Sequence, residues 1–185
     1  MTSSLAETAH RQRIRQLSRV LAVACLCLIV LLPVAVVGYW LAADGPQLAV
    51  RAQLPVQAIQ APLMVWQRWA GALLSMLPLS LLLTGLWEAR RCFQRFVAGE
   101  IFSAGTVGCL RRFAGWVMAS VAAGMATATA ISVLLTINNP PGMRHLAISV
   151  GSDQVFTLFF AGMVWLMAAV IGEARELADE NAAFV

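Results

Sequence analysis

Four long apolar stretches constrain what this chain can fold into. Arg68 is their one charged side chain, and it lies near the start of the second stretch. About 20 apolar residues in a helix cross a hydrocarbon core of about 30 Å, and a helix bonds its own backbone where water is absent. The pattern therefore predicts an all-α membrane protein, a bundle of four transmembrane helices. The expected helices are 20–43, 63–87, 113–137 and 154–172.

The composition excludes a soluble domain. Apolar residues make up 60% of the 185 residues and charged residues 12%, against about 45–50% and about 25% in soluble domains. So few charges cannot cover the surface of a small soluble protein, and part of that surface must face lipid. We expect a single integral membrane domain over residues 1–185, with the lipid bilayer as its surroundings. The first stretch is too long for the core of a cleaved signal, which has about 7–15 residues.

The arginines predict the orientation of the helices. All 13 cationic side chains are arginine, and cytoplasmic connections carry an excess of such residues. Four precede the first stretch, five lie between Glu88 and Arg112, and one is in the tail. The other three are Arg51, Arg68 and Arg144. Both termini and the middle connection are therefore predicted on the cytoplasmic side. Aromatic residues expected at the outer interface are Tyr39, Trp40, Trp66 and Trp69, and those at the inner one are Trp87 and Trp116.

The connections between the spans carry local signals. The second span is expected to continue as a cytosolic helix over 88–98 and to end at Gly99, which suits the position after a helix. Ser103 is expected to cap the next helix, and the cytosolic tail covers 173–185. The outer loops, 44–62 and 138–153, each contain a short apolar stretch. These stretches, Leu48–Val50 and Leu146–Val150, are predicted to pair as a small external β-sheet.

Prolines and small residues indicate how the spans pack. Pro33 and Pro78 are expected to kink the first and second spans. The third span carries two rows of small residues at steps of four, which allow helix backbones to approach closely. The rows serve packing within the bundle or, alternatively, form the face of a homo-oligomer. They consist of Gly115, Ala119 and Ala123, and of Ser120, Gly124 and Ala128.

No constellation of residues indicates catalysis. Charges deep in a membrane mark proton relays and ion pathways, and the middle of every span lacks them. His10 and His145 are predicted on opposite sides of the bilayer, so they cannot share a metal. The four cysteines lack metal-site spacing and are expected to be reduced thiols. We expect no enzyme, no catalytic residue, no cofactor and no metal, and we expect span hydroxyls to bond helix carbonyls.

Charged residues on the cytosolic side form the candidate interaction surface. We hypothesise that the acidic face of the tail docks on arginines of the extension 88–98. In the alternative interpretation the arginines face phospholipid and the tail is solvated. The candidate residues are Arg90, Arg91, Arg95, Phe102, Arg111, Arg112, Glu173, Glu176, Asp179 and Glu180.

Three segments resemble a known family. Phe96–Ser103, Leu110–Phe113 and the acidic ending Glu176–Val185 are similar to motifs of a bacterial four-span membrane family of unknown function. The Asn that this family usually has after the Phe-Ser/Thr pair is not found here, where Gly105 and Thr106 stand. Members are often encoded beside small Cro/CI-type helix-turn-helix regulators. The resemblance implies the bacterial inner membrane and a DNA-binding partner, and it brings no catalytic residues.

These observations lead to one functional hypothesis and two alternatives. The first is a non-enzymatic inner-membrane protein that acts as a membrane partner or sensor for a cytosolic helix-turn-helix regulator and does not itself bind nucleic acid. The second is a component of a small-solute channel or transporter. The third is a structural subunit of a larger membrane complex.

Overall fold

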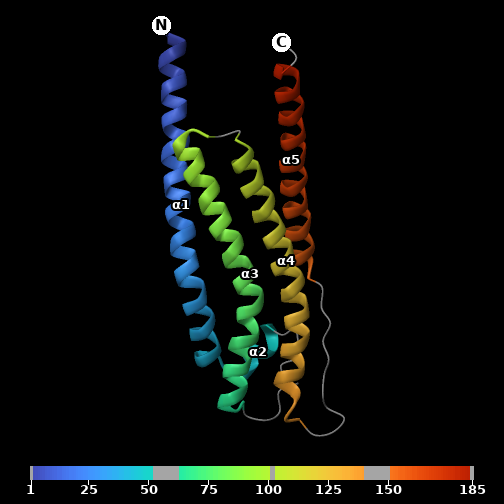
Figure 1. Ribbon diagram of the computed structural model, residues 1–185. Coiled ribbons are helices and arrows are strands. Elements are labelled where there is room, and N and C mark those ends of the chain that lie inside the picture. Colours follow the sequence, from blue (N-terminus) through green and yellow to red (C-terminus); the bar gives the residue numbers. More distant parts are fainter. Residues whose placement is uncertain (1, 52–62, 101–102, 140–150, 184–185) are drawn as a thin grey trace. The chain divides into compact units, whose positions relative to one another are not determined.

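The computed structural model describes residues 2–51, 63–100, 103–139 and 151–183. Within these ranges the chain is helical and contains no strand. Figure 1 shows the helices in chain order. They are α1 (Thr2–Ala42), α2 (Gly45–Arg51), α3 (Val65–Ala98), α4 (Ala104–Thr136) and α5 (Ser152–Ala183).

Four of these helices, α1, α3, α4 and α5, are long and apolar enough to cross a membrane. Many large apolar side chains remain exposed, among them Leu73 at 75% and Phe156 at 62%. The predicted all-α class is confirmed for the described residues, as is the prediction of four helices long and apolar enough to span a membrane. With 34 residues, α3 is about 50 Å long, so it extends beyond a hydrocarbon core of about 30 Å.

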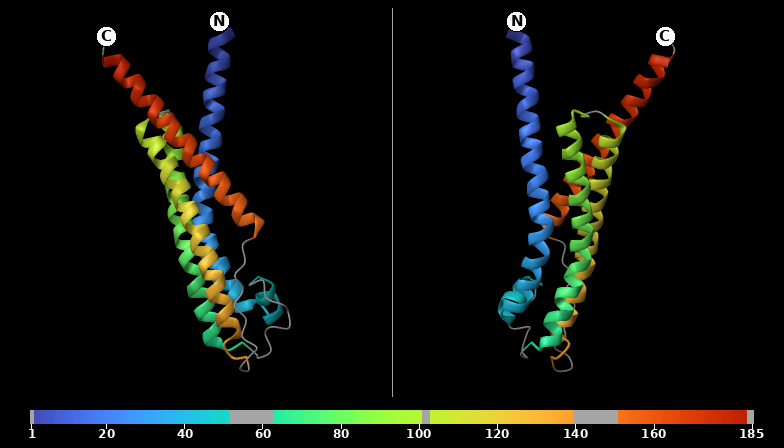
Figure 2. Two further views of the ribbon diagram at one scale, coloured as in Figure 1. Left: turned by 90° about the vertical axis from the view of Figure 1, so that its right-hand side faces the viewer. Right: turned by 60° about the vertical axis from the view of Figure 1, so that its left-hand side comes forward.

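The chain divides into two compact units. The first unit comprises Met1–Ile29, Leu83–Met118 and Phe159–Val185. The second unit comprises Val30–Leu82 and Ala119–Leu158. Within each unit, α3 and α4 lie side by side in all views (Figures 1 and 2). The segments predicted to share the arginine-rich side all belong to the first unit.

The ends of α3 and α4 in the first unit follow the sequence signals. Gly99 has a φ of 90°, its N–H donates to the carbonyl of Phe96, and the N–H of Glu100 donates to the carbonyl of Arg95. This pair of bonds closes a helix with glycine just after it. Ser103 Oγ accepts the N–H of Thr106 at 3.2 Å. The predicted helix stop and N-cap are confirmed, and α4 begins nine residues before the predicted span.

The outer-loop segment Leu48–Val50 is helical, because it belongs to α2. The prediction that it forms a strand is wrong, and its intended partner, Leu146–Val150, lies outside the described residues. Leu48 and Ala49 are buried in a cluster with Trp40. A helix satisfies the backbone of these residues locally while it places both side chains in that cluster.

Trp40 lies in the core of the second unit. It is 3% exposed, and its ring lies so close to Gly71 that a Cβ there would collide with it. Its indole N–H donates to Ser75 Oγ at 2.9 Å. Trp40 therefore does not face lipid, whereas Trp66 and Trp69 are exposed, and the position of all three at the outer interface stays a prediction.

Arg68, the charge inside the second apolar stretch, completes the C-terminus of α1. Its Nη1 donates to the carbonyls of Leu41 and Ala43, both at 2.9 Å, and to that of Trp40 at 3.3 Å. The last carbonyls of a helix have no partner within the helix, and a cation stabilises this negative end of its dipole. Arg68 therefore has a structural role in the second unit.

Gln67 joins the start of α3 to the end of α4. Its side chain is nearly fully buried, and Nε2 donates to the carbonyl of Leu134 at 2.9 Å. Oε1 accepts the backbone N–H of Met64 at 2.9 Å and Nδ2 of Asn138 at 3.1 Å. One amide thus satisfies polar groups at two helix ends.

We predict that Gln67→Leu lowers the free energy of unfolding by about 2 kcal/mol, because the three hydrogen bonds of a buried amide are lost. The thermal midpoint of the purified protein in detergent measures this. Ser80→Ala is the matched control, since the exposed Ser80 hydroxyl bonds only to the carbonyl of Leu77 within α3. Equal midpoints for the two variants would contradict the role given to Gln67.

Candidate functional site

A cluster around Glu88 lies where α3 and α4 run together in the first unit. Glu88 is buried and accepts hydrogen bonds from two arginines. Arg91 Nη1, one turn further along α3, is 2.9 Å from Oε1, and Arg112 Nε, from α4, is 3.1 Å from Oε2. Arg112 Nη2 also lies 3.3 Å from the sulfur of Cys109. Glu88 therefore links the two helices and fixes two guanidinium groups.

The charged groups in this cluster stabilise one another's ionised forms. Burial acts to raise the pKa of Glu88, but the hydrogen bond and charge of Arg112, with the charge of Arg91, outweigh it, so that its pKa is lowered. The hydrogen bond to Glu88 raises the pKa of Arg112. Glu88 follows the predicted span 63–87, so this pair lies at or beyond the bilayer edge. The Glu88 carboxylate and the Arg112 guanidinium are therefore ionised at neutral pH.

Two more of the predicted arginines stack on tryptophans. The guanidinium of Arg90 is 5.2 Å from the ring centre of Trp87, and that of Arg111 is 4.9 Å from that of Trp165 on α5. Such cation–π contacts contribute about 0.5–1 kcal/mol at exposed sites. The contact between Arg111 and Trp165 brings α5 to the cluster.

The remaining predicted arginine, Arg95, lies beside Gly105. A side chain at position 105 would collide with the Arg95 guanidinium, so glycine provides the space for it. Arg95, Arg91 and Arg112 line a hollow of about 380 Å³. We call Arg90, Arg91, Arg95, Arg111 and Arg112, together with Glu88, the arginine cluster.

The other predicted interaction residues are less closely connected to this cluster. Glu173, Glu176 and Glu180 are exposed on α5. The ion pairs of Arg91 and Arg112 are with Glu88, so docking of the tail on the arginines stays a prediction. Phe102 and the side chain of Asp179 lie outside the described residues.

The two rows of small residues on α4 have different surroundings. Ser120, Gly124 and Ala128 line a cavity in the second unit, and a Cβ at Gly124 would meet Pro78 of α3 at 3.9 Å. The other row begins at Gly115, where no described atom lies within 4 Å of a Cβ position. Its use as a face between copies of the chain stays a prediction.

Sequence reasoning missed Glu88 and Trp165 as members of the site. Glu88 is the first acidic residue after the second apolar stretch, three positions before Arg91, and this spacing could have suggested a pair on one helix face. Arg112 is 24 positions away from Glu88, and no local spacing predicts that contact.

The described residues contain few potential metal ligands close to one another. Among residues 2–51, 63–100, 103–139 and 151–183, no group of three or more His, Cys, Asp or Glu side chains could hold one. Burial, with Cys109 nearby, raises the pKa of Cys92 to about 11. At neutral pH Cys92 is therefore a protonated thiol and a poor metal ligand.

The long apolar helices and the arginine cluster define the class of the protein. By the length and composition of α1, α3, α4 and α5, it is a multi-pass membrane protein. The chain belongs to a family described as a protein of unknown function (DUF2975), whose model matches residues 55–185. The resemblance to a family of unknown function is thus confirmed, and the matched range includes α3, α4 and α5. No curated protein and no solved structure matches the chain.

We predict that Arg112→Met destabilises the protein more than Arg91→Met. Arg112 crosses from α4 to α3, and its removal leaves buried Glu88 with one partner, at an expected loss of about 1–2 kcal/mol. Arg91 pairs within its own helix, and such pairs contribute about 0.2–0.5 kcal/mol. Thermal midpoints in detergent at low salt provide the comparison. The opposite order would show that Glu88 does not depend on its contact across the helices.

Acid is predicted to weaken the cluster through Glu88. Its pKa is lowered in the folded protein, so its stabilisation is fully present above the unfolded value of about 4.3 and is lost as the pH falls through the lower folded value. Glu88→Gln removes this dependence. On acidification from about pH 6 to about pH 3, the wild-type midpoint should fall further than that of Glu88→Gln. Parallel curves would contradict a lowered pKa.

Proposed function

We propose that this protein is a non-enzymatic protein of the bacterial inner membrane that holds a cytosolic partner at its arginine cluster. Both termini and the connection between α3 and α4 lie in the cytoplasm in this proposal. The partner presents an acidic surface, and the family resemblance favours a small helix-turn-helix transcriptional regulator. The protein itself does not bind nucleic acid.

The observation that carries the proposal is the concentration of five positioned arginines in one unit. Glu88 fixes two of them and tryptophans hold two more. The side chains of Arg91 and Arg112 are still 55% and 54% exposed, so both can meet a partner. Pre-positioned guanidinium groups lose less freedom on binding and form paired hydrogen bonds with carboxylates.

The cluster is better suited to a protein partner than to solvation alone. Ordinary surface arginines are mobile, whereas these contact Glu88, Trp87 and Trp165. The exposed acidic residues of α5 belong to the same unit. In this proposal a partner competes with the acidic tail for the arginines. It binds when the tail moves away from them and is released when the tail returns. A change in lipid or in an external ligand would shift spans kinked at Pro33 and Pro78 and so alter this surface.

The test is co-purification of the tagged full-length protein from solubilised membranes of its own bacterium. We expect a helix-turn-helix protein to follow the wild-type chain, and we expect Arg95→Glu combined with Arg111→Glu to reduce its yield about tenfold or more, because like charges now face the acidic partner. Arg13→Glu is the matched control, since Arg13 is an exposed arginine of the same unit outside the cluster and should leave the yield unchanged.

Two results would contradict the proposal. One is the absence of a helix-turn-helix protein from the wild-type sample in every growth condition. The other is an equal loss with Arg13→Glu, which would indicate attraction by net charge alone. Protease treatment of sealed inverted vesicles should remove a tag on the C-terminus, and protection of that tag would contradict the cytoplasmic orientation.

A further inference from the structure

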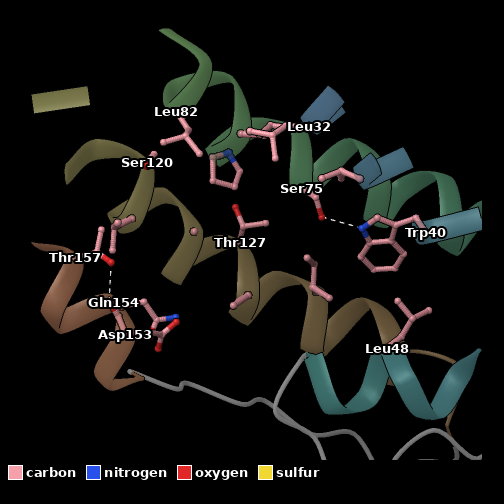
Figure 3. A pocket seen from close by; sticks show the side chains of 17 residues that line it. Leu32, Trp40, Leu48, Ser75, Leu82, Ser120, Thr127, Asp153, Gln154 and Thr157 are labelled. Atoms are coloured by element: carbon pink, nitrogen blue, oxygen red, sulfur yellow. Dashed lines mark hydrogen bonds between the residues drawn. The ribbon is translucent and has the colours of Figure 1, made fainter. Parts of the chain in front are cut away.

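The second unit contains a cavity that the proposed function does not use. Its volume is about 650 Å³, within the range of about 300–1,000 Å³ that is typical of small-molecule sites. Residues of α1, α2, α3, α4 and α5 line it, and Figure 3 shows their side chains around the cavity. Most of the described lining is apolar, with side chains such as Leu32, Leu79 and Ile131.

Thr127 presents an unused hydroxyl to this cavity. The residue is 8% exposed and lies in the middle of the third predicted span. Its hydroxyl points into the cavity (Figure 3) and bonds to none of the residues that the structure describes. Nearby hydroxyls are satisfied, since Ser75 donates to the carbonyl of Gly71 and Thr157 to that of Asp153. The Thr127 hydroxyl is open to the cavity, so a molecule bound there would supply its hydrogen-bond partner.

One end of the cavity carries a carboxylate. Asp153 is the one ionisable side chain among the described lining residues, and it pairs with no described cation. It lies in the first turn of α5, and Figure 3 shows it on the side of the cavity that holds Thr157, away from Trp40 and Leu48. Gln154 beside it accepts the backbone N–H of Gly151. The lining thus combines a carboxylate at one end with apolar walls along the rest of the cavity.

We propose that this cavity binds one single-chain amphiphile with a primary ammonium head group. The ammonium faces Asp153 and donates a hydrogen bond to the Thr127 hydroxyl, and the alkyl chain lies along the apolar walls. The head group comes from a membrane phospholipid of the ethanolamine type or from a free long-chain amine. The site belongs to the second unit and does not depend on the partner proposed for the arginine cluster.

The test is native mass spectrometry of the purified full-length protein in detergent, titrated with three amphiphiles that share one chain. Hexadecylammonium, hexadecanol and hexadecanoate share a hexadecyl-length chain and carry a positive, a neutral and a negative head group. We expect one equivalent of hexadecylammonium to bind, about fivefold more tightly than the alcohol because of one carboxylate partner, and the anion to bind most weakly. Lysophosphatidylethanolamine separates the sources: tighter binding than hexadecylammonium assigns a phospholipid, and weaker binding assigns a free amine.

Three variants connect this binding to the cavity. Asp153→Asn should abolish the preference for the ammonium over the alcohol and leave alcohol binding unchanged. Asp44→Asn is the matched control, because Asp44 is an exposed carboxylate of the same unit outside the described lining and should change nothing. Thr127→Val, nearly equal in shape, should weaken all three amphiphiles about fivefold by the loss of one hydrogen bond.

Some results would overturn the proposal. Binding of more than one equivalent without saturation would indicate partition into the micelle, and equal binding of the three amphiphiles would exclude recognition of a cation. Equal effects of Asp153→Asn and Asp44→Asn would exclude Asp153 as the partner. If the variants have the same thermal midpoints as the wild-type protein, a loss of affinity is not caused by unfolding.

Discussion

The structure depends on one constraint, which is that a backbone in lipid has no water to bond. Helices satisfy the interior of each span, but the first four N–H groups and last four carbonyls of every helix still need partners. Polar residues at these ends supply them. Arg68 bonds the last carbonyls of α1, and Gln67 serves the start of α3 and the end of α4. Gly99 and Ser103 complete the connection between α3 and α4.

The same constraint explains where charge is tolerated. Arg68 lies inside an apolar stretch because three carbonyls surround its guanidinium, and Glu88 is buried because two arginines meet its carboxylate. Each charge therefore has a fixed position and a defined partner. In the arginine cluster, Glu88 holds the guanidinium groups of Arg91 and Arg112 in place while both side chains stay exposed. This combination is the basis for proposing a surface that binds a partner.

The second unit presents a different kind of chemistry. Its cavity combines apolar walls with a hydroxyl at depth and a carboxylate at one end. Thr127 and Asp153 come from different helices, and neither attracts attention in the sequence, where hydroxyls in spans usually bond their own helix. That expectation is confirmed at Ser75, Thr129, Ser132, Thr136 and Thr157. Thr127 differs because its hydroxyl faces the cavity instead of a carbonyl of its own helix.

The sequence by itself determined the four spans, the stop at Gly99 and the cap at Ser103, because these depend on transfer to lipid and on neighbours within a few residues. It did not determine the helical state of Leu48–Val50, the burial of Trp40 or the contact of Glu88 with Arg112. Each span carries apolar residues on most of its faces, so the periodicity of the sequence does not reveal which face packs inward. The tertiary structure decided these features through the rotation and packing of each helix, which place partners from distant parts of the chain together.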